Sequence, residues 1–270
     1  PTDAALLLEV MAGPDAFDST VSSHPVDAYA SPQVRDPARP IRIAYLTDGV
    51  DSEGVAPAIR AATQQAIDRL RAAGHVVEPV TLSLLKYLLP TYYVLTTAEA
   101  SSNLSRFDGV RYGYRATEGV TDLISMYKKS RTEGFGPEAR KRILLGTFVL
   151  SASYYEAYYT KAQQVRRLVR EETERVFEHY DFLMMPTTPT SAFALGKKSD
   201  QNPETDPLQM YLADLFTVQA NVTGYPAISI PNGFDSNAEG PALPIGLQFM
   251  APPFREQALV TMAETYLALA

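Results

Sequence analysis

An arginine and an aspartate, far apart in the chain, carry most of the chemistry that this sequence offers. Asp214 lies in the apolar segment MYLADLFT, where a carboxylate needs a cation or several hydrogen-bond donors. Arg142 borders the apolar run ILL, and a guanidinium can hold a carboxylate with two parallel hydrogen bonds. Together they suit a zwitterionic amino acid, the arginine taking its α-carboxylate and the aspartate its α-ammonium. The alternative, that they pair with each other or with the backbone, is the one the residues alone favour.

Other candidates for catalysis are weak. Ser125 and Lys128 match a serine–lysine spacing of some acyl-transfer enzymes, but a match of two residues is common, and Lys128 fits a solvated helix face. The chain has no cysteine, and its three histidines, His24, His75 and His179, are scattered. Thiol catalysis and zinc–thiolate sites are therefore excluded, and the histidine spacing predicts no metal site.

Composition places the chain among ordinary globular proteins. It has 270 residues, 46% hydrophobic and 20% charged, which is enough for one large domain or two small ones. The net charge of -7 argues against a nonspecific grip on nucleic-acid phosphates by this chain alone. No stretch approaches the roughly 18 apolar residues of a membrane span, so we expect no membrane partner and a cytoplasmic location.

Hydrophobic periodicity predicts an α/β fold with a mixed β-sheet covered by helices on both faces. A strand over residues 41–47, a helix over 56–73 and a strand over 76–82 form a βαβ unit, so the two strands should be parallel. Residues 14–40 contain several prolines and should form an irregular crossing segment. Further helices are predicted over 3–11 (buried), 84–107 (interrupted at Pro90), 121–132, 208–221 and 256–269. Two more helices are predicted within 130–180, with a break near 151–153. Further strands are predicted over 182–185, 228–231 and 243–250, and a loop is predicted over 194–206.

Several long blocks resemble the amidase signature family. They are EASSNLSRFDGVRYGYR, SRTEGFGPEARKRILLGTFVLSASYYEAYYTKAQQVRRL, PTTPTSAF, DPLQMYLADLFTVQANVTGYPAISIP and LPIGLQFMAPPF. Within that family they are similar to the A subunits of aspartyl/glutamyl-tRNA amidotransferases. The resemblance implies that residues 1–270 are the C-terminal portion of a single amidase domain.

The resemblance also implies a function. Proteins of this kind are glutaminases: a serine attacks glutamine, and the released ammonia passes to the B subunit, which amidates Glu-tRNA(Gln) or Asp-tRNA(Asn). The implied partners are the B and C subunits of the amidotransferase, L-glutamine, and charged tRNA held by the B subunit. ATP and Mg²⁺ would be used by that partner, with no cofactor in this chain. The alternatives are a non-catalytic binding or docking module derived from an amidase, and a general amidase of the same superfamily.

The resemblance implies counterparts in this chain for only some of the family's site residues. The family's lysine, cis-serine and nucleophilic serine have no matching position in residues 1–270, so no catalytic residue is assigned and the chain alone is expected to be inactive. The family's pocket arginine and aspartate match Arg142 and Asp214, which shifts the balance toward substrate binding. A pocket tyrosine matches Tyr92 or Tyr93, and we prefer Tyr92.

Overall fold

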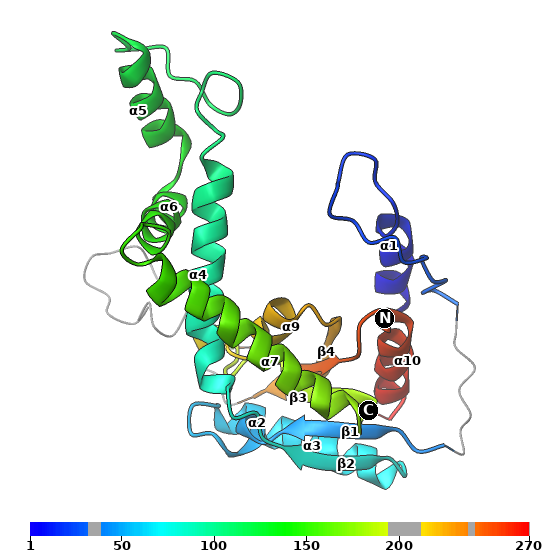
Figure 1. Cartoon of the computed structure of the whole chain (residues 1–270). Coiled ribbons are helices and arrows are strands. Elements are labelled where there is room, and N and C mark those ends of the chain that lie inside the picture. Colours follow the sequence, from blue (N-terminus) through cyan, green and yellow to red (C-terminus); the bar gives the residue numbers. More distant parts are fainter. Residues whose placement is uncertain (32–38, 194–211, 237–240, 270) are drawn as a thin grey trace. The chain divides into compact units, whose positions relative to one another are not determined.

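The computed structural model describes residues 1–31, 39–193, 212–236 and 241–269 (Figure 1). The chain divides into two compact units. The sheet unit comprises Pro1–Leu85 and Val169–Ala270, and the helical unit comprises Lys86–Leu168. Each unit is described separately below.

A five-stranded mixed sheet, ordered β2-β1-β3-β5-β4, forms the centre of the sheet unit. The strands are β1 (Arg42–Leu46), β2 (Val76–Val80), β3 (Phe182–Pro186), β4 (Ala227–Asp235) and β5 (Leu243–Met250). Strand β1 pairs in parallel with β2 and β3, whereas β5 is antiparallel to β3 and β4. The predicted mixed sheet and the predicted parallel pair are confirmed.

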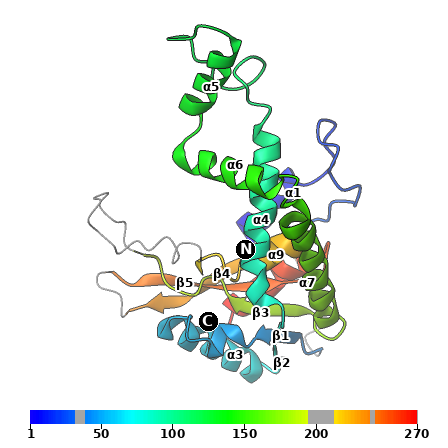
Figure 2. The same ribbon diagram turned by 60° about the vertical axis from the view of Figure 1, so that its left-hand side comes forward.

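One face of this sheet packs against α3 (Pro57–Ala72) and α10 (Glu256–Leu267). Because side chains alternate along a strand, every second strand residue points to this face. The resulting core includes Ile43, Met184 and Phe249 from the strands. Figure 2 shows α3 running along this side of the sheet.

The opposite face is also buried. Ala44, Leu183 and Met250 are completely buried, although they alternate with the core residues of the first face. On this side Gln219 of α9 (Val218–Thr223) donates to Thr173 Oγ1 of α7 (Lys161–Phe177) at 3.1 Å. The prediction that helices cover both faces is therefore confirmed.

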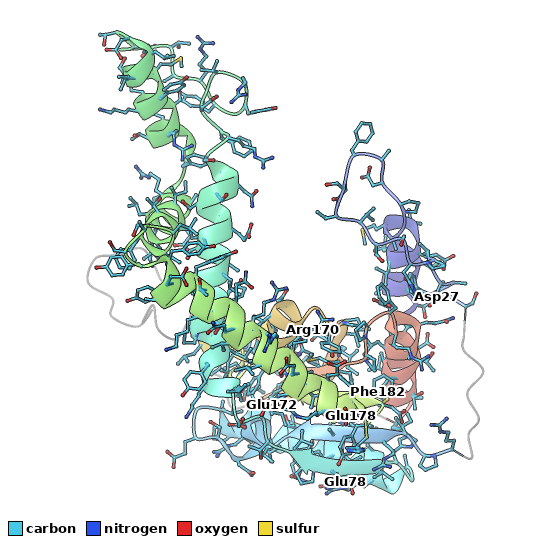
Figure 3. All side chains as sticks on the ribbon, viewed as in Figure 1. Asp27, Glu78, Arg170, Glu172, Glu178 and Phe182 are labelled. Carbon is cyan, nitrogen blue, oxygen red and sulfur yellow. The ribbon has the colours of Figure 1, made fainter. Side chains whose placement is uncertain are left out.

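Glutamate side chains tie the outer turns of the sheet unit to its strands. Glu172 of α7 accepts hydrogen bonds from the backbone amides of Ser83 and Leu84, which follow β2, at 2.8 and 3.3 Å. On β2, Glu78 accepts from the Tyr180 hydroxyl at 2.8 Å. Figure 3 labels both glutamates, which join α7 and the residues after it to β2 and the turn that follows it.

The first helix, α1 (Thr2–Met11), is less buried than its apolar sequence predicts. Only Ala5 is buried, where it packs with Tyr29 and Val260 of α10, while Val10 is 85% exposed. The expectation of a buried helix is wrong because only one stripe of the helix contacts its neighbour. The described part of residues 14–40 contains no helix or strand, and the short α2 (Asp48–Asp51) follows β1.

Helices build the helical unit. They are α4 (Leu85–Leu104), α5 (Leu123–Gly134), α6 (Pro137–Val149), the π-helix η1 (Glu156–Thr160) and the first part of α7. The break predicted near residues 151–153 is confirmed. Pro90, by contrast, does not interrupt α4, although a proline inside a helix cannot donate the amide hydrogen bond to the residue four positions earlier.

Two predicted elements fall wholly or partly outside the described residues. These are the loop over 194–206 and the start of the helix over 208–221. In the described remainder, Leu212 is helical, residues 213–217 form turns, and α9 begins at Val218.

Candidate functional site

A close crossing of α4 and α6 positions the candidate arginine. Gly146 of α6 lies so near α4 that a Cβ atom there would be 2.0 Å from the carbonyl oxygen of Thr97. Next to it, Ser101 and Thr147 share a hydroxyl hydrogen bond of 3.1 Å. Since residues four apart share a helix face, this contact directs Arg142, one turn before Gly146, toward α4.

Arg142 therefore lies beside the aromatic pair of α4. Tyr92 and Tyr93 pack edge to face, with ring centroids 5.2 Å apart. The Arg142 guanidinium donates from Nε to Glu138 Oε1 at 2.9 Å, and its side chain is 37% exposed. The hydrogen bond to Glu138 raises the pKa of Arg142 above its usual value; burial opposes this, while Tyr92 and Tyr93 add to it. The structure thus brings together two of the three predicted residues, the arginine and either tyrosine.

Glu138 is a neighbour of Arg142 that sequence reasoning missed. The signal was present, since a glutamate four residues before an arginine on a helix commonly forms an ion pair. The pair uses Nε, and the end of the guanidinium that carries the two Nη nitrogens does not take part in this bond. A carboxylate could meet those two nitrogens end-on while Glu138 holds the side chain in place.

Asp214, the third predicted residue, belongs to the sheet unit. It is half-buried, and it occupies the turn that leads into α9. Its carbonyl accepts hydrogen bonds from the amides of Thr217 and Val218 at 3.1 and 3.0 Å. Next to this turn, Phe216 is completely buried and its carbonyl accepts from Gln248 of β5 at 3.1 Å. The turn is therefore anchored to the sheet, and the convergence of Asp214 with Arg142 stays a prediction.

The serine–lysine candidate is structural. Ser125 is the third residue of α5 and forms a reciprocal capping box with Asp122. Its amide donates to Asp122 Oδ1 at 2.7 Å, while its hydroxyl oxygen accepts from the Asp122 amide at 2.9 Å. Such a box satisfies amides at a helix start. Lys128 is exposed, as the solvated-face interpretation predicts.

A cavity of about 450 Å³ is lined by residues of the sheet unit. It is near the starts of β1 and β3, and its lining includes Arg39, Tyr180, Phe182 and Arg255. None of the three predicted site residues lines it. Among the described residues there is no cluster of histidine and acidic side chains that could hold a metal ion. None of the described helices combines the length and apolarity needed to cross a membrane.

The α/β architecture and the sequence blocks define one class of protein. The chain belongs to the Amidase family, whose sequence model matches residues 2–260. The resemblance inferred from the sequence blocks is confirmed at this level.

Two relatives within that family that are nearly half identical to this chain share one name. The chain is 47% identical over 268 residues to the glutamyl-tRNA(Gln) amidotransferase A subunit of Halothermothrix orenii, covering 98% of this chain and 53% of the relative. It is 48% identical over 261 residues to the protein of the same name from Koribacter versatilis, covering 97% and 52%. The chain therefore spans about half the length of these relatives.

Solved structures agree with the family assignment. The crystal structure of the glutamyl-tRNA(Gln) amidotransferase A subunit from Thermotoga maritima matches with a TM-score of 0.71 and 35% identity, covering 97% of this chain and 49% of that one. A 6-aminohexanoate cyclic dimer hydrolase matches with a TM-score of 0.70 at 22% identity, covering 99% and 52%. The second match shows that the fold is shared with a hydrolase of another name.

Proposed function

We propose that this chain is the glutamine-binding part of the A subunit of a tRNA-dependent amidotransferase. The observation that carries the proposal is the 47% identity over 98% of the chain to a relative of that name. On this proposal the assembled enzyme hydrolyses glutamine, and the ammonia amidates Glu-tRNA(Gln) or Asp-tRNA(Asn) on the B subunit, which uses ATP and Mg²⁺. The C subunit would complete the assembly.

Arg142 would bind the substrate's α-carboxylate. The arrangement supports this role because Glu138 fixes the guanidinium through Nε, while the Tyr92–Tyr93 pair lies beside it. A held guanidinium loses less side-chain freedom when it binds a carboxylate than a mobile one does. Asp214, which is half-buried, would take the α-ammonium.

The role of such a pocket is positioning. Holding both α-groups fixes the side-chain amide of glutamine relative to a nucleophile, and correct placement supplies much of the rate of such reactions. The nucleophile itself would come from polypeptide that corresponds to the part of the relatives not matched here. The chain alone would then release no ammonia from glutamine.

Steady-state kinetics of the assembled amidotransferase containing this sequence test the proposal. Arg142→Lys keeps the charge but loses the two-pronged geometry, so the KM for glutamine should rise about 10- to 100-fold, the equivalent of one lost charged hydrogen bond. Arg140→Lys is the matched control, since Arg140 is an exposed arginine of the same helix, and it should leave KM unchanged. An unchanged KM in Arg142→Lys, or ammonia release by the chain alone, contradicts the assignment.

A further inference from the structure

Charge is divided unequally between the two units. The helical unit contains 13 lysine and arginine residues against 7 aspartate and glutamate residues, a net charge of +6. The sheet unit contains 11 against 24, a net charge of -13. The overall charge of -7 therefore conceals a basic unit, and charge asymmetry of this kind is typical of chains that bind polyanions through one part only.

Within the helical unit, the segment between α4 and α5 combines exposed cations with exposed aromatic rings. We call residues 105–120, whose first part reads SRFDGVRYGYR, the basic–aromatic loop. Arg106, Arg111 and Arg115 are exposed, and so are the residues Tyr112 and Tyr114, at 54% and 55%. Exposed aromatic rings next to arginines suit a ligand that offers both phosphates and flat bases.

The loop is held in one conformation by its own contacts. Asp108 Oδ1 accepts from the amides of Val110 and Arg111 at 2.8 and 3.1 Å, and the Gly109 amide donates to the Tyr112 carbonyl at 3.1 Å. Gly109 has φ +78°, and a Cβ there would meet Ser130 Oγ at 2.5 Å. No other residue would fit this turn without strain, so Arg111 and Tyr112 are presented at a fixed tip.

Contacts with α5 fix the base of the same loop. Arg131 Nη1 donates to the carbonyls of Leu104 and Phe107 at 2.9 and 3.0 Å. Ser130 Oγ accepts from the Ala116 amide at 3.0 Å, and the Tyr114 hydroxyl donates to Glu133 at 2.9 Å. A platform ordered before binding loses little conformational entropy when a ligand arrives.

Two acidic side chains at the loop, those of Asp108 and Glu133, are already engaged, although the exposed Glu118 also belongs to the loop. The carboxylate of Asp108 is used by the turn amides, and Glu133 by Tyr114. The Arg111–Asp108 ion pair is 3.8 Å long with the arginine side chain 74% exposed, and an ion pair that exposed contributes little. The Arg111 guanidinium is thus accessible to a phosphate.

We propose that the basic–aromatic loop binds RNA, with Arg111 and Arg115 contacting phosphates and Tyr112 stacking on an unpaired base. The identification of that RNA as tRNA rests on the proposed function. Single-stranded RNA ends and loops present both a phosphate chain and splayed bases, which is the combination that this loop can recognise.

Fluorescence anisotropy of the full chain, with a labelled tRNA transcript and a labelled single-stranded RNA of about 10 nucleotides as probes, tests this at about 50 to 200 mM KCl. Binding should weaken as salt increases. Arg111→Ala with Arg115→Ala should reduce the slope of log K against log salt by about 1.4, because each phosphate that is no longer neutralised removes about 0.7. Arg175→Ala, an exposed arginine in the sheet unit, is the control and should change neither affinity nor slope.

Stacking is tested separately. Tyr112→Ala should weaken binding about 5- to 150-fold, the range measured for loss of one base–aromatic stack, whereas Tyr112→Phe should retain it. Absence of binding to both probes, or binding that these loop variants leave unchanged, overturns the proposal. The proposal is also overturned if polyglutamate binds as tightly as RNA and Tyr112→Ala does not weaken that binding. This outcome would indicate an acidic protein partner instead. Because the KM for glutamine reports on Arg142 and anisotropy on the loop, either assignment can fail without the other.

Discussion

The two units of this chain hold themselves together in different ways. The sheet unit surrounds a mixed sheet with helices and buries large side chains such as Phe249 and Tyr266 completely. The helical unit keeps many aromatic and aliphatic side chains at its surface, among them Phe148, which is 46% exposed and packs on Tyr154 with ring centroids 4.3 Å apart. The difference is that the sheet unit buries its large apolar side chains, whereas the helical unit leaves many of them at its surface, where a partner could contact them.

Replacing one phenylalanine in each unit should give the largest difference between the units in lost unfolding free energy. Phe249→Ala removes a fully buried ring that contacts Phe182 and Tyr266, so the sheet unit should lose about 3–5 kcal/mol of unfolding free energy. Phe148→Ala removes an exposed ring and should cost the helical unit only about 0.5–1.5 kcal/mol. Amide hydrogen exchange under increasing urea measures the two units separately, and equal losses would remove the distinction.

Two glycines of the helical unit, one in a close helix crossing and one in open space, allow a second comparison. Gly146→Ala should force α6 away from α4 and cost about 1–3 kcal/mol, because its Cβ would lie 2.0 Å from the Thr97 carbonyl. Gly136→Ser is the control, since nothing lies within 4 Å of that position and serine is a favoured N-cap residue. Exchange protection of α6 amides reports the effect. Unchanged protection in Gly146→Ala would show that this crossing does not hold Arg142 in place.

The smallest expected effect is a pH dependence of the basic–aromatic loop. Hydrogen bonds from the Val110 and Arg111 amides lower the pKa of Asp108 below its usual value of 3.8. A carboxyl group whose pKa is lowered on folding stabilises the folded state above its unfolded pKa, and this contribution disappears as pH falls through the folded pKa. The loop should thus keep its turn down to pH 3.8 and loosen below it.

NMR chemical shifts of the Val110 and Arg111 amides, followed from neutral to strongly acidic pH, measure this transition. The midpoint should lie below 3.8, and Asp108→Asn should abolish it. A midpoint at or above 3.8 would show that the turn amides do not stabilise the ionised carboxylate.

Local sequence patterns determined much of the architecture. The strand and helix pattern around residues 41–82 predicted the β1–α3–β2 unit and its parallel pairing, because alternation and periodicity report which face of an element is buried. The blocks around Arg142 predicted the family, and the structure places the tyrosine pair beside that arginine. The ion pair with Glu138 could also have been predicted, since its spacing is visible in the sequence.

Packing between distant segments decided the rest. Neither the exposure of α1 nor the 2.0 Å approach at Gly146 follows from local pattern, because each depends on what lies opposite in space. The net charge of -7 argued against nucleic acid, yet the division of the chain into two units reveals a +6 region that a sum over the whole sequence conceals. Composition adds charges without regard to position, whereas a ligand meets only those that folding gathers on one part of the molecule.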